Sequence, residues 1–497
     1  MSTVASLVNS CLMASYEGRT PPEWIRAAVA DGLAGVGIFG TNLTPPAEPG
    51  APPYGTFHED IAAPLRAVRP DVLIALDEEG GDVTRLDYHR GSPYPGNHAL
   101  GAVDDTDLTR DVARAIGADL AEAGVNLCFG PCADVNSQPD NPIIGVRSFG
   151  ADAPRVARHT EAFVRGLQEN GVAATLKHFP GHGDTGVDSH TAFPDIDRDL
   201  AALRALDLPP FAAGAAAGAR AVMVGHIRLP HLAEPPATLS PRIVTGLLRD
   251  ELGYDGVVVS DALEMAPVLD RWGFGGAAVL AWAAGVDLVV LGASGVEHVL
   301  PEVHRAVEEA LAKGELTLAR LEEAAARVTA LRRWAVPTTT GAPRHGIGLV
   351  AARRALAATG LPGPDGRPLH TVRLAGEANM AVGVAPWGLE DALAGLGRLA
   401  SATDVTPETA PDGVPLPDDG PLAVVVRDAA RHPWQRDALA ALRARRPGLV
   451  TVDMGLEPAP GLLAPPLLLT RGAGLANAVA AAELLTGRAW TGPLRER

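Results

Sequence analysis

The chain has 497 residues and a formal net charge of −17, which comes from 42 basic and 59 acidic residues. An acidic surface opposes binding to phosphate backbones, and the sequence has no basic stripe with interleaved aromatic residues, so no nucleic-acid partner is expected. Hydrophobic residues make up 47% of the chain. Gly, Pro and charged residues nevertheless break every apolar run before it reaches the roughly 18 residues of a membrane span. We therefore expect a soluble globular protein.

The amino terminus and the cysteines indicate a reducing compartment. The stretch MSTVASLVNSCLMASYEG (1–18) lacks both a basic segment and a continuous apolar core, so it does not resemble a secretory signal. We expect a cytoplasmic location. Cys11, Cys128 and Cys132 cannot all pair with one another, and none has the repeated spacing of a zinc site. They are expected to be buried small hydrophobic side chains, with no metal and no other cofactor.

Short apolar runs rich in Val, Ile, Leu and Ala recur along the first 340 residues. They lie at 32–40, 72–77, 124–131, 172–179, 221–226, 256–261 and 286–292. None shows polar alternation, which is typical of parallel strands that are covered on both faces. Helical segments such as 154–171 and 241–253 lie between them. Seven or eight such units, with polar residues at the strand ends, favour a (β/α)8 barrel over a doubly wound sheet for residues 1–340.

A second domain is expected over residues 341–497. The helical segment 317–334 is followed by a stretch rich in Pro, Thr and Gly, AVPTTTGAPRHG (335–346), which has the composition of a linker. Beyond it come strand candidates at 370–375, 422–427, 449–454 and 466–471, with helical runs at 434–446 and 475–487. This pattern predicts a smaller α/β sandwich domain. The acidic, proline-rich segment 403–420 is expected to be a surface loop.

In a (β/α)8 barrel the carboxyl ends of the strands carry the active site. Six apolar runs are followed by titratable residues, namely Asp77, Asp134, Arg147, Lys177 with His178, His226, and Asp261. A single residue of this kind can cap a helix or form a buried ion pair. Several of them at one mouth indicate a functional site.

The stretch KHFPGHGDTGVDSH (177–190) concentrates histidines and aspartates on one expected loop. A metal could be held by His178, His182 and His190 together with Asp184 or Asp188. Their order, however, matches no helical zinc signature, and the intervening glycines leave the ligand geometry unfixed. A serine nucleophile at position 189 would need a strained turn between glycines, which the sequence does not offer there. Both hypotheses are weaker than acid and base catalysis.

Acid and base catalysis by His190 is the favoured hypothesis for this loop. Asp188 precedes His190 by two residues, so in an extended segment both side chains face the same side. A carboxylate at that position fixes the tautomer of the imidazole and favours its protonated form near neutral pH. A purely structural pair that ties down the loop is the alternative.

A proton donor needs a partner, and Asp261 is the candidate. In GVVVSDALEM the carboxylate follows a buried strand, where it could attack a carbon from the face opposite the leaving group. Glu264 is the rival carboxylate. We expect it on the following turn or helix, where it caps that element or faces solvent.

The runs KHFPGHG, DTGV and DSH resemble the signature of glycoside hydrolase family 3, and specifically of its β-N-acetylglucosaminidase (NagZ-like) branch. Three further segments are similar to this family in the same order: DEEGGDVTRL (77–86), GVRSFG (145–150) and the region 236–265 that ends in VVVSDALEM. The resemblance covers most of residues 1–340 and implies a barrel. The carboxyl-terminal part resembles the α/β domain of longer members.

The resemblance implies roles for individual residues. Asp261 would be the nucleophile and His190 the acid/base, with Asp188 as its partner in a dyad. The sugar in the −1 subsite would be bound by Asp77, Arg85, Arg147, Lys177 and His178. Vicinal hydroxyls suit carboxylate acceptors and cationic donors, because charged hydrogen bonds are the strong ones.

The sequence departs from the family pattern at three positions. Glu78 stands where Gln is usual, and Asp82 stands where Arg is usual, so both are expected to add negative charge near the mouth. Ala262 occupies a position where a second Asp is common, which singles out Asp261. His182 and Asp184 are expected to shape the loop.

The resemblance thus predicts a retaining exo-acting β-N-acetylglucosaminidase. It would remove terminal β-linked N-acetylglucosamine from peptidoglycan fragments or chitin oligosaccharides by double displacement. A small carbohydrate is the expected partner. The nearest alternatives are a β-glucosidase of the same family and an N-acetylglucosaminide phosphorylase, since a neutral histidine base does not repel phosphate. More distant alternatives are a substrate-assisted hexosaminidase that uses the Asp77-Glu78 pair, a metallohydrolase and a non-catalytic sugar-binding protein.

Overall fold

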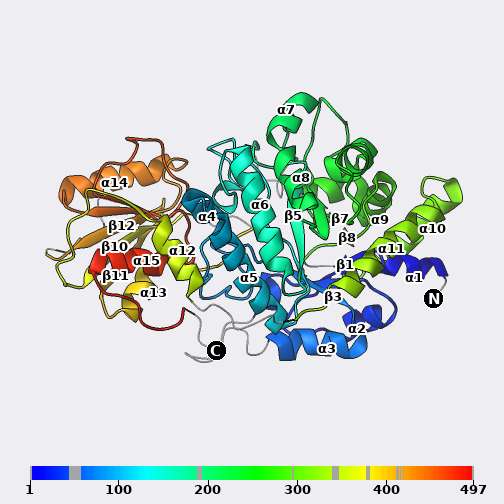
Figure 1. Cartoon of the computed structure of the whole chain (residues 1–497), viewed down its shortest axis with the longest axis horizontal. Coiled ribbons are helices and arrows are strands. Elements are labelled where there is room, and N and C mark those ends of the chain that lie inside the picture. The colour runs from blue at the N-terminus through cyan, green and yellow to red at the C-terminus, as the bar shows by residue number, and fades with distance from the viewer. Residues whose placement is uncertain are drawn as a thin grey trace.

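The computed structural model describes residues 3–43, 57–186, 193–293, 296–338, 346–376, 381–409, 414, 416–417 and 419–494. They form two domains, each built around its own sheet, which lie side by side along the long axis of the molecule (Figure 1). The predicted boundary at residues 340/341 lies outside the described residues. None of the described helices is long and apolar enough to cross a membrane.

The first sheet is an eight-stranded parallel barrel. Its strands are β1 (Leu12–Ala14), β2 (Gly35–Gly37), β3 (Leu73–Leu76), β4 (Leu127–Cys128), β5 (Ala173–Phe179), β6 (Ala221–Val224), β7 (Val257–Ser260) and β8 (Val289–Val290). They are paired in the order β7-β6-β5-β4-β3-β2-β1-β8, and a parallel bridge between Val259 and Leu288 closes the ring. The predicted barrel is confirmed. Strand β1 was not predicted from the sequence, because three apolar residues are too short a run to recognise.

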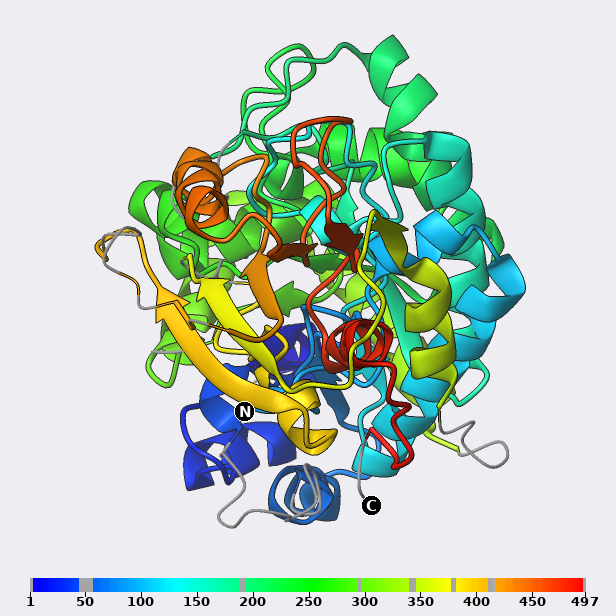
Figure 2. The ribbon, with the colours of Figure 1, turned by 90° about the vertical axis from the view of Figure 1, so that its left-hand side faces the viewer.

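Helices surround the barrel (Figure 2). The α-helices are α1 (Thr3–Asn9), α2 (Glu23–Ala30), α3 (Ala63–Val68), α4 (Asn97–Val103), α5 (Thr106–Ala123), α6 (Ala153–Gln168), α7 (Leu200–Leu206), α8 (Leu208–Ala216), α9 (Ala266–Ala284), α10 (Val299–Lys313) and α11 (Leu318–Trp334). Helical segments of the 3₁₀ or π type occur at η1 (Gly40–Asn42), η2 (His58–Ala62), η3 (Gly145–Arg147), η4 (Ala237–Leu239) and η5 (Arg242–Glu251).

Local signals explain where the long helices begin and end. The Asp105 side chain accepts a hydrogen bond from the Leu108 N–H at the start of α5, and Asp152 caps α6 in the same way through the Arg155 N–H. Helix α5 ends at Ala123 and is followed by Gly124, whose φ of 83° lies in the left-handed region that favours glycine. The predicted helical segment 241–253 is present, but Arg242–Glu251 forms a π-helix.

The second sheet has six strands in the order β11-β10-β12-β13-β14-β9. They are β9 (Ala357–Thr359), β10 (Leu369–Leu374), β11 (Leu399–Val405), β12 (Leu422–Val426), β13 (Val450–Asp453) and β14 (Leu467–Leu469). All neighbours are parallel except β9, which is antiparallel to β14. The four predicted strands are present. Strands β9 and β11 were not predicted from the sequence, and β11 includes the first residues of the segment expected to be a loop.

Helices cover both faces of the second sheet. They are α12 (Ile347–Ala355), α13 (Glu390–Gly395), α14 (Pro433–Arg445) and α15 (Leu475–Thr486). Buried residues of α12, α13 and α15 share one apolar cluster with the sheet, and α14 packs on the opposite face. The predicted α/β sandwich is therefore confirmed.

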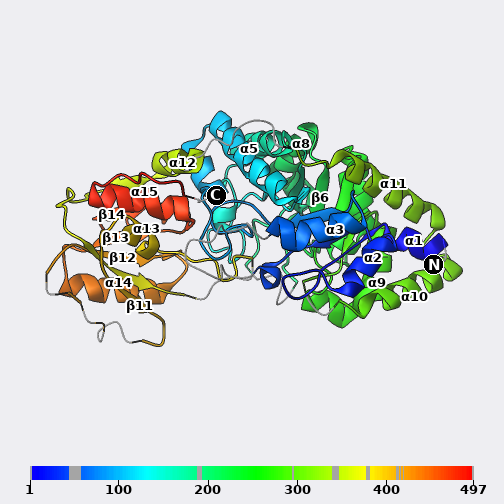
Figure 3. The same cartoon turned by 90° about the horizontal axis from the view of Figure 1, so that it is seen from below.

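The second domain lies over the carboxyl-terminal end of the barrel. Helix α12 packs against both α15 and the barrel helix α4 (Figure 1). A Cβ atom at Gly348 of α12 would lie 2.0 Å from the Pro93 carbonyl oxygen, so only glycine permits this approach. Helices α1, α10 and α11 lie at the far end of the barrel (Figure 3). The barrel mouth, where the site was predicted, is thus the end that faces the second domain.

Candidate active site

A cavity of about 590 Å³ opens at the carboxyl ends of the barrel strands. Six of the predicted site residues line it: Asp77, Arg85, Arg147, Lys177, His178 and Asp261. They come from the segments that follow β3 and β7, from η3 and from the end of β5. The predicted acid/base pair, Asp188 and His190, lies outside the described residues. The six residues that line the cavity are up to 184 positions apart in the sequence, and the tertiary structure brings them together.

Two carboxylates and three cations form a network on one side of this cavity. Lys177 Nζ lies 2.6 Å from Asp77 Oδ1 and 2.7 Å from Glu79 Oε1. Arg147 donates to Glu79 through Nε at 3.0 Å and Nη2 at 2.8 Å. Arg85 Nη2 lies 3.7 Å from Asp77 Oδ2. Such an array presents fixed donors and acceptors side by side, which suits the vicinal hydroxyls of a sugar.

The network keeps its carboxylates ionised. Burial opposes the ionisation of Glu79, but the adjacent Arg147 and Lys177 hold its pKa far below the ordinary range. Burial likewise opposes the ionisation of Asp77, and Lys177 and Arg85 lower its pKa. The carboxylates in turn raise the pKa of the Arg147 guanidinium and of the Lys177 ammonium against the effect of burial. All four groups are thus charged at neutral pH.

Glu79 was not predicted as a site residue from the sequence. It is buried behind Arg147 and Lys177, so it supports the cavity wall without lining the cavity. A signal was present, because Glu79 follows Asp77 by two residues and alternate side chains of an extended segment face the same side. Glu78, between them, turns away and accepts hydrogen bonds from the Arg85 and Leu86 N–H groups at 2.9 and 3.0 Å.

The expectation that Glu78 and Asp82 add negative charge at the mouth is wrong. Neither residue lines the cavity, and both are buried. Glu78 braces the segment between residues 77 and 88, which we call the β3 loop, and burial raises its pKa to about 7. Asp82 pairs with Arg427 of the second domain, with 2.5 Å between Oδ2 and Nη2.

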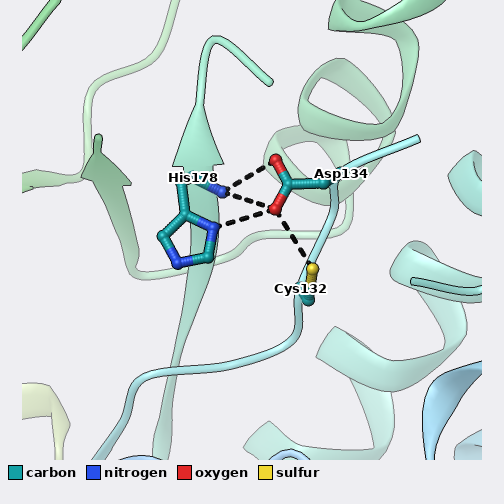
Figure 4. A group of neighbouring side chains, drawn as sticks. All are labelled: Cys132, Asp134 and His178. Carbon is teal, nitrogen blue, oxygen red and sulfur yellow. Dashed lines mark hydrogen bonds and ion pairs between the residues drawn. The ribbon is translucent and has the colours of Figure 1, made fainter. Parts of the chain in front are cut away.

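His178 is oriented by a buried aspartate that also follows an apolar run. Asp134 accepts a 2.8 Å hydrogen bond from His178 Nδ1, as well as bonds from the His178 backbone N–H and from the Cys132 thiol (Figure 4). It also accepts a bond from the backbone N–H of His182. Burial opposes the ionisation of Asp134, but His178 and His182 lower its pKa to about 2. Because Asp134 engages Nδ1, His178 has Nε2 available for a ligand in the cavity.

Cys132, Asp134 and His178 also have the spacing of a metal site, since one donor atom from each lies within 4.8 Å of the others. The donor set does not fit a cation. The oxygens of Asp134 already accept bonds from two N–H groups of the backbone, one of imidazole and one thiol. Burial and the neighbouring Asp134 raise the pKa of the Cys132 thiol well above its ordinary value, so the thiol keeps its proton. The trio is a hydrogen-bonded cluster that orients His178.

His182 and Asp184 shape the segment that leads toward residues 187–192, as expected. His182 Nδ1 lies 2.7 Å from Thr185 Oγ1, and burial lowers the pKa of His182 to about 4, so its ring is neutral at neutral pH. Asp184 pairs with Arg198 at 3.1 Å. Another predicted strand-end residue, His226, lies outside the cavity lining and donates through Nε2 to the Ala262 carbonyl oxygen.

Asp261 is held at the end of β7 with its side chain in the cavity. Its backbone N–H donates to the Val224 carbonyl oxygen at 3.0 Å, and its Oδ1 accepts from the Ala262 N–H at 2.9 Å. Glu264 lines the same cavity, where its Oε1 accepts a 2.6 Å hydrogen bond from the Ala293 N–H. The rival carboxylate is therefore a wall residue fixed to the backbone after β8.

The second domain contributes to the cavity through a segment that was not singled out from the sequence. Ala381 is one of the lining residues, and its carbonyl oxygen accepts a 2.9 Å hydrogen bond from Arg85 Nη2. Three residues later, the Val384 N–H donates to Tyr88 Oη at 3.2 Å. The arginine expected to bind the sugar is thus held from both domains.

Comparisons with known proteins agree with this arrangement. The model of the glycosyl hydrolase family 3 N terminal domain matches residues 34–331. The chain is 41% identical to a beta-hexosaminidase A from Pseudoalteromonas piscicida, over 44% of this chain and 40% of that protein. It is 38% identical to a beta-hexosaminidase from Stenotrophomonas maltophilia, over 54% of this chain and 78% of that protein.

A solved structure resembles the whole chain. It is a glycoside hydrolase family 3 beta-N-acetylglucosaminidase from Paenibacillus sp. str. FPU-7, with 30% sequence identity and a TM-score of 0.84, and the likeness covers 100% of this chain and 99% of that one. The expected arrangement of a barrel followed by an α/β domain recurs there. Sequence motifs, fold and comparisons lead to the same conclusion: the chain belongs to glycosyl hydrolase family 3.

Proposed function

We propose that the protein is a retaining exo-acting β-N-acetylglucosaminidase. It removes terminal β-linked N-acetylglucosamine from peptidoglycan fragments or chitin oligosaccharides. The observation that carries this proposal is the single cavity in which Asp261 faces the charged network of Asp77, Lys177 and Arg147. The names of the relatives, beta-hexosaminidase and beta-N-acetylglucosaminidase, support the choice of sugar.

The reaction proceeds in two displacements. Asp261 attacks the anomeric carbon while His190, oriented by Asp188, protonates the departing glycosidic oxygen. His190 then removes a proton from water, and the resulting nucleophile attacks the anomeric carbon of the covalent ester. The C–O bond to Asp261 breaks, and the sugar leaves with its original anomeric configuration.

Binding of the terminal sugar depends on the groups around Asp261. The Asp77 carboxylate accepts hydrogen bonds from ring hydroxyls, while Arg85, Arg147 and Lys177 donate to their oxygens. His178 donates or accepts through Nε2, because Asp134 holds the other ring nitrogen. These groups act on substrate without any bound metal. A cytoplasmic location for this activity stays a prediction from the sequence.

The test compares an aryl N-acetyl-β-glucosaminide with the matching aryl β-glucoside, without added metal. We expect the wild type to prefer the acetamido substrate, and Asp261→Ala and His190→Ala to lose activity by about 10²-fold or more. Asp197→Ala, at a side chain that is 93% exposed, serves as the matched control and stays fully active. A faster rate on the glucoside would instead identify a β-glucosidase.

Trapping of the covalent intermediate tests whether Asp261 or the acetamido group of the substrate is the nucleophile. A 2-fluoro sugar forms a long-lived ester with an enzymatic carboxylate, and peptide mapping then locates the adduct. We expect the label on Asp261 alone. A substrate-assisted mechanism, with the Asp77-Glu78 pair in the catalytic role, gives no adduct on Asp261 and would contradict the double displacement.

A further inference from the structure

The second domain contacts the β3 loop (residues 77–88) at several points, although this loop belongs to the barrel. Asp82 Oδ2 pairs with Arg427 Nη2 at 2.5 Å, and Asp82 Oδ1 accepts from the Ala473 N–H at 2.7 Å. Arg427 directly follows β12, and Ala473 lies four residues after β14. Residues that follow strands β12 and β14 of the second sheet thus bind the β3 loop at the barrel mouth.

The β3 loop is also tightly confined between the two domains. Gly81 has a φ of +60°, and a Cβ atom there would lie 2.5 Å from the Gly96 Cα in the barrel. A Cβ atom at Gly474 of the second domain would lie 3.1 Å from the Gly81 Cα. Such close backbone packing leaves little room for the loop to move while the two domains stay docked.

Asp82 stands midway between two residues of the sugar-binding network. Glu79, which holds Arg147 and Lys177, precedes it by three positions, and Arg85, which faces Asp77, follows it by three. Neither Asp82 nor Arg427 lines the cavity. An effect of this pair on the reaction must therefore pass through the loop that carries the network.

We propose that Asp82 and Arg427 are positioning residues, through which the second domain holds the β3 loop in the geometry that the terminal sugar requires. This inference rests on the proposed function. It assigns the second domain a part in catalysis without placing any of its side chains on the reacting atoms. It also gives a reason for Asp82, which stands where the family run usually has Arg: its charge matches a basic residue of the second domain.

The surroundings of Asp82 predict that the effect of losing Arg427 depends on pH. Burial raises the pKa of Asp82 above its ordinary value even with Arg427 present, and the carboxylates of Asp428 and Glu79 act in the same direction. Without Arg427, the carboxyl group keeps the Ala473 N–H but has no cation beside it. It stays neutral at low pH and becomes an unpaired buried charge as the pH rises, which disturbs the loop.

The test measures kcat and KM of the whole chain on a chromogenic N-acetyl-β-glucosaminide across a range of pH. Methionine replaces Arg427 because its chain retains apolar bulk beside the Trp387 ring, over which the guanidinium lies at 5.9 Å. We expect Arg427→Met to lower kcat/KM by roughly 10- to 100-fold, since small displacements of binding groups have effects of this size. The loss should grow toward alkaline pH.

A second variant separates the effect of the unpaired carboxylate charge from a general effect on folding. The double substitution Arg427→Met/Asp82→Asn removes the unpaired buried carboxylate, and the amide oxygen that it introduces still accepts from the Ala473 N–H. We expect the additional alkaline loss to disappear and part of kcat/KM to return. Arg427→Lys, which restores a cation, should recover part of the activity in the same way. Equal loss at every pH in the single and double variants would contradict positioning by this pair.

Arg354→Met is the matched control. It breaks the Arg354–Asp105 ion pair, which also joins the two domains but is exposed and has no contact with the β3 loop in the described structure. We expect its kcat/KM to stay within about two-fold of wild type, because exposed pairs contribute little. An equal loss in both arginine variants would show general weakening of the interface and overturn the proposal, as would a folded Arg427→Met enzyme with wild-type kinetics.

Amide hydrogen exchange gives a readout that does not depend on activity. Exchange of the β3 loop should be faster in Arg427→Met than in wild type and unchanged in Arg354→Met. If the wild type hydrolyses neither aryl glycoside, the proposed function fails, while loop exchange still decides whether the pair positions the loop. Identical exchange of the loop in all three proteins would overturn the positioning role by itself.

Discussion

Glu79 accepts two hydrogen bonds from Arg147, with Oε2 3.0 Å from Nε and Oε1 2.8 Å from Nη2. Its Oε1 also lies 2.7 Å from Lys177 Nζ. One buried carboxylate therefore holds two cations of the cavity wall. Because planar guanidinium and carboxylate groups match in a two-bond pair, this contact fixes the direction as well as the charge of Arg147.

Neutralising Glu79 should damage both stability and activity. In Glu79→Gln two buried cations face each other without their shared carboxylate, so we expect the free energy of unfolding to fall by about 3–5 kcal/mol. The displaced cations should lower kcat/KM by about 100-fold. Denaturant unfolding and steady-state kinetics measure the two effects. Glu161→Gln, in an exposed pair with Arg165, is the matched control and should cost under about 1 kcal/mol. Wild-type kinetics in Glu79→Gln would refute a role in holding the cations.

Glu78 should make stability depend on pH. Burial raises the pKa of Glu78 from 4.5 to about 7. The unfolded chain loses this proton near pH 4.5, whereas the folded chain keeps it until about pH 7. The free energy of unfolding is therefore highest below the pKa that Glu78 has in the unfolded chain, declines as the pH rises, and is lowest above its pKa in the folded chain. The two limits differ by about 3 kcal/mol at most.

Glu78→Gln mimics the protonated side chain at every pH. We expect it to match the wild type near pH 4 and to exceed it in unfolding free energy by up to about 3 kcal/mol near pH 8. Urea titrations at both pH values, with Glu161→Gln as the exposed counterpart, give the difference. A constant difference between variant and wild type across this range would rule out a raised pKa for Glu78.

Chelation should not affect turnover. The Cys132, Asp134 and His178 donors are occupied by protons and hydrogen bonds, so removal of divalent ions should leave kcat/KM unchanged. Activity is measured after dialysis against a chelator and again after zinc is returned. A loss that zinc restores would mean that this cluster, or residues outside the described part of the chain, holds a metal that the reaction needs.

Hydrolysis should prevail over phosphorolysis. Among the described residues, each of the three Arg and Lys side chains that line the cavity faces a carboxylate: Arg85 faces Asp77, Arg147 faces Glu79, and Lys177 faces both. An incoming phosphate would meet cations that are already compensated, so it should gain little over water. We expect the free sugar as product with and without inorganic phosphate, at equal rates. Formation of a sugar 1-phosphate, detected by phosphorus NMR, would reverse this assignment.

Short-range pattern and local chemistry explain what the sequence could predict of the fold. Runs such as 172–179 and 256–261 are mostly apolar and lack polar alternation because parallel barrel strands are buried on both faces, and this property is visible in the sequence. Strand β1, with three residues, and the edge strands β9 and β11 leave weaker patterns, since their length or exposure removes the contrast with loops.

The same contrast applies to the candidate site, where local patterns predict some residues and partners distant in the sequence determine the importance of others. Asp77, Lys177 and Asp261 could be named from the sequence because they carry reactive groups at the ends of buried strands: Asp77 and Asp261 directly follow β3 and β7, and Lys177 lies near the end of β5. Glu79, Asp82 and Ala381 gain their importance from partners 68, 345 and 296 positions away, which are Arg147, Arg427 and Arg85 respectively. No local pattern encodes such partners.

The sequence by itself determined which titratable residues stand at or just after the expected strands, and its motifs predicted which of them take part in glycoside cleavage. Only the tertiary structure decided that Asp82 faces the second domain instead of the mouth, and that Glu79 holds two cations at once. The physical reason is that burial and ion pairing depend on distance in space. Those distances exist only after both sheets have formed and the second domain has docked on the barrel.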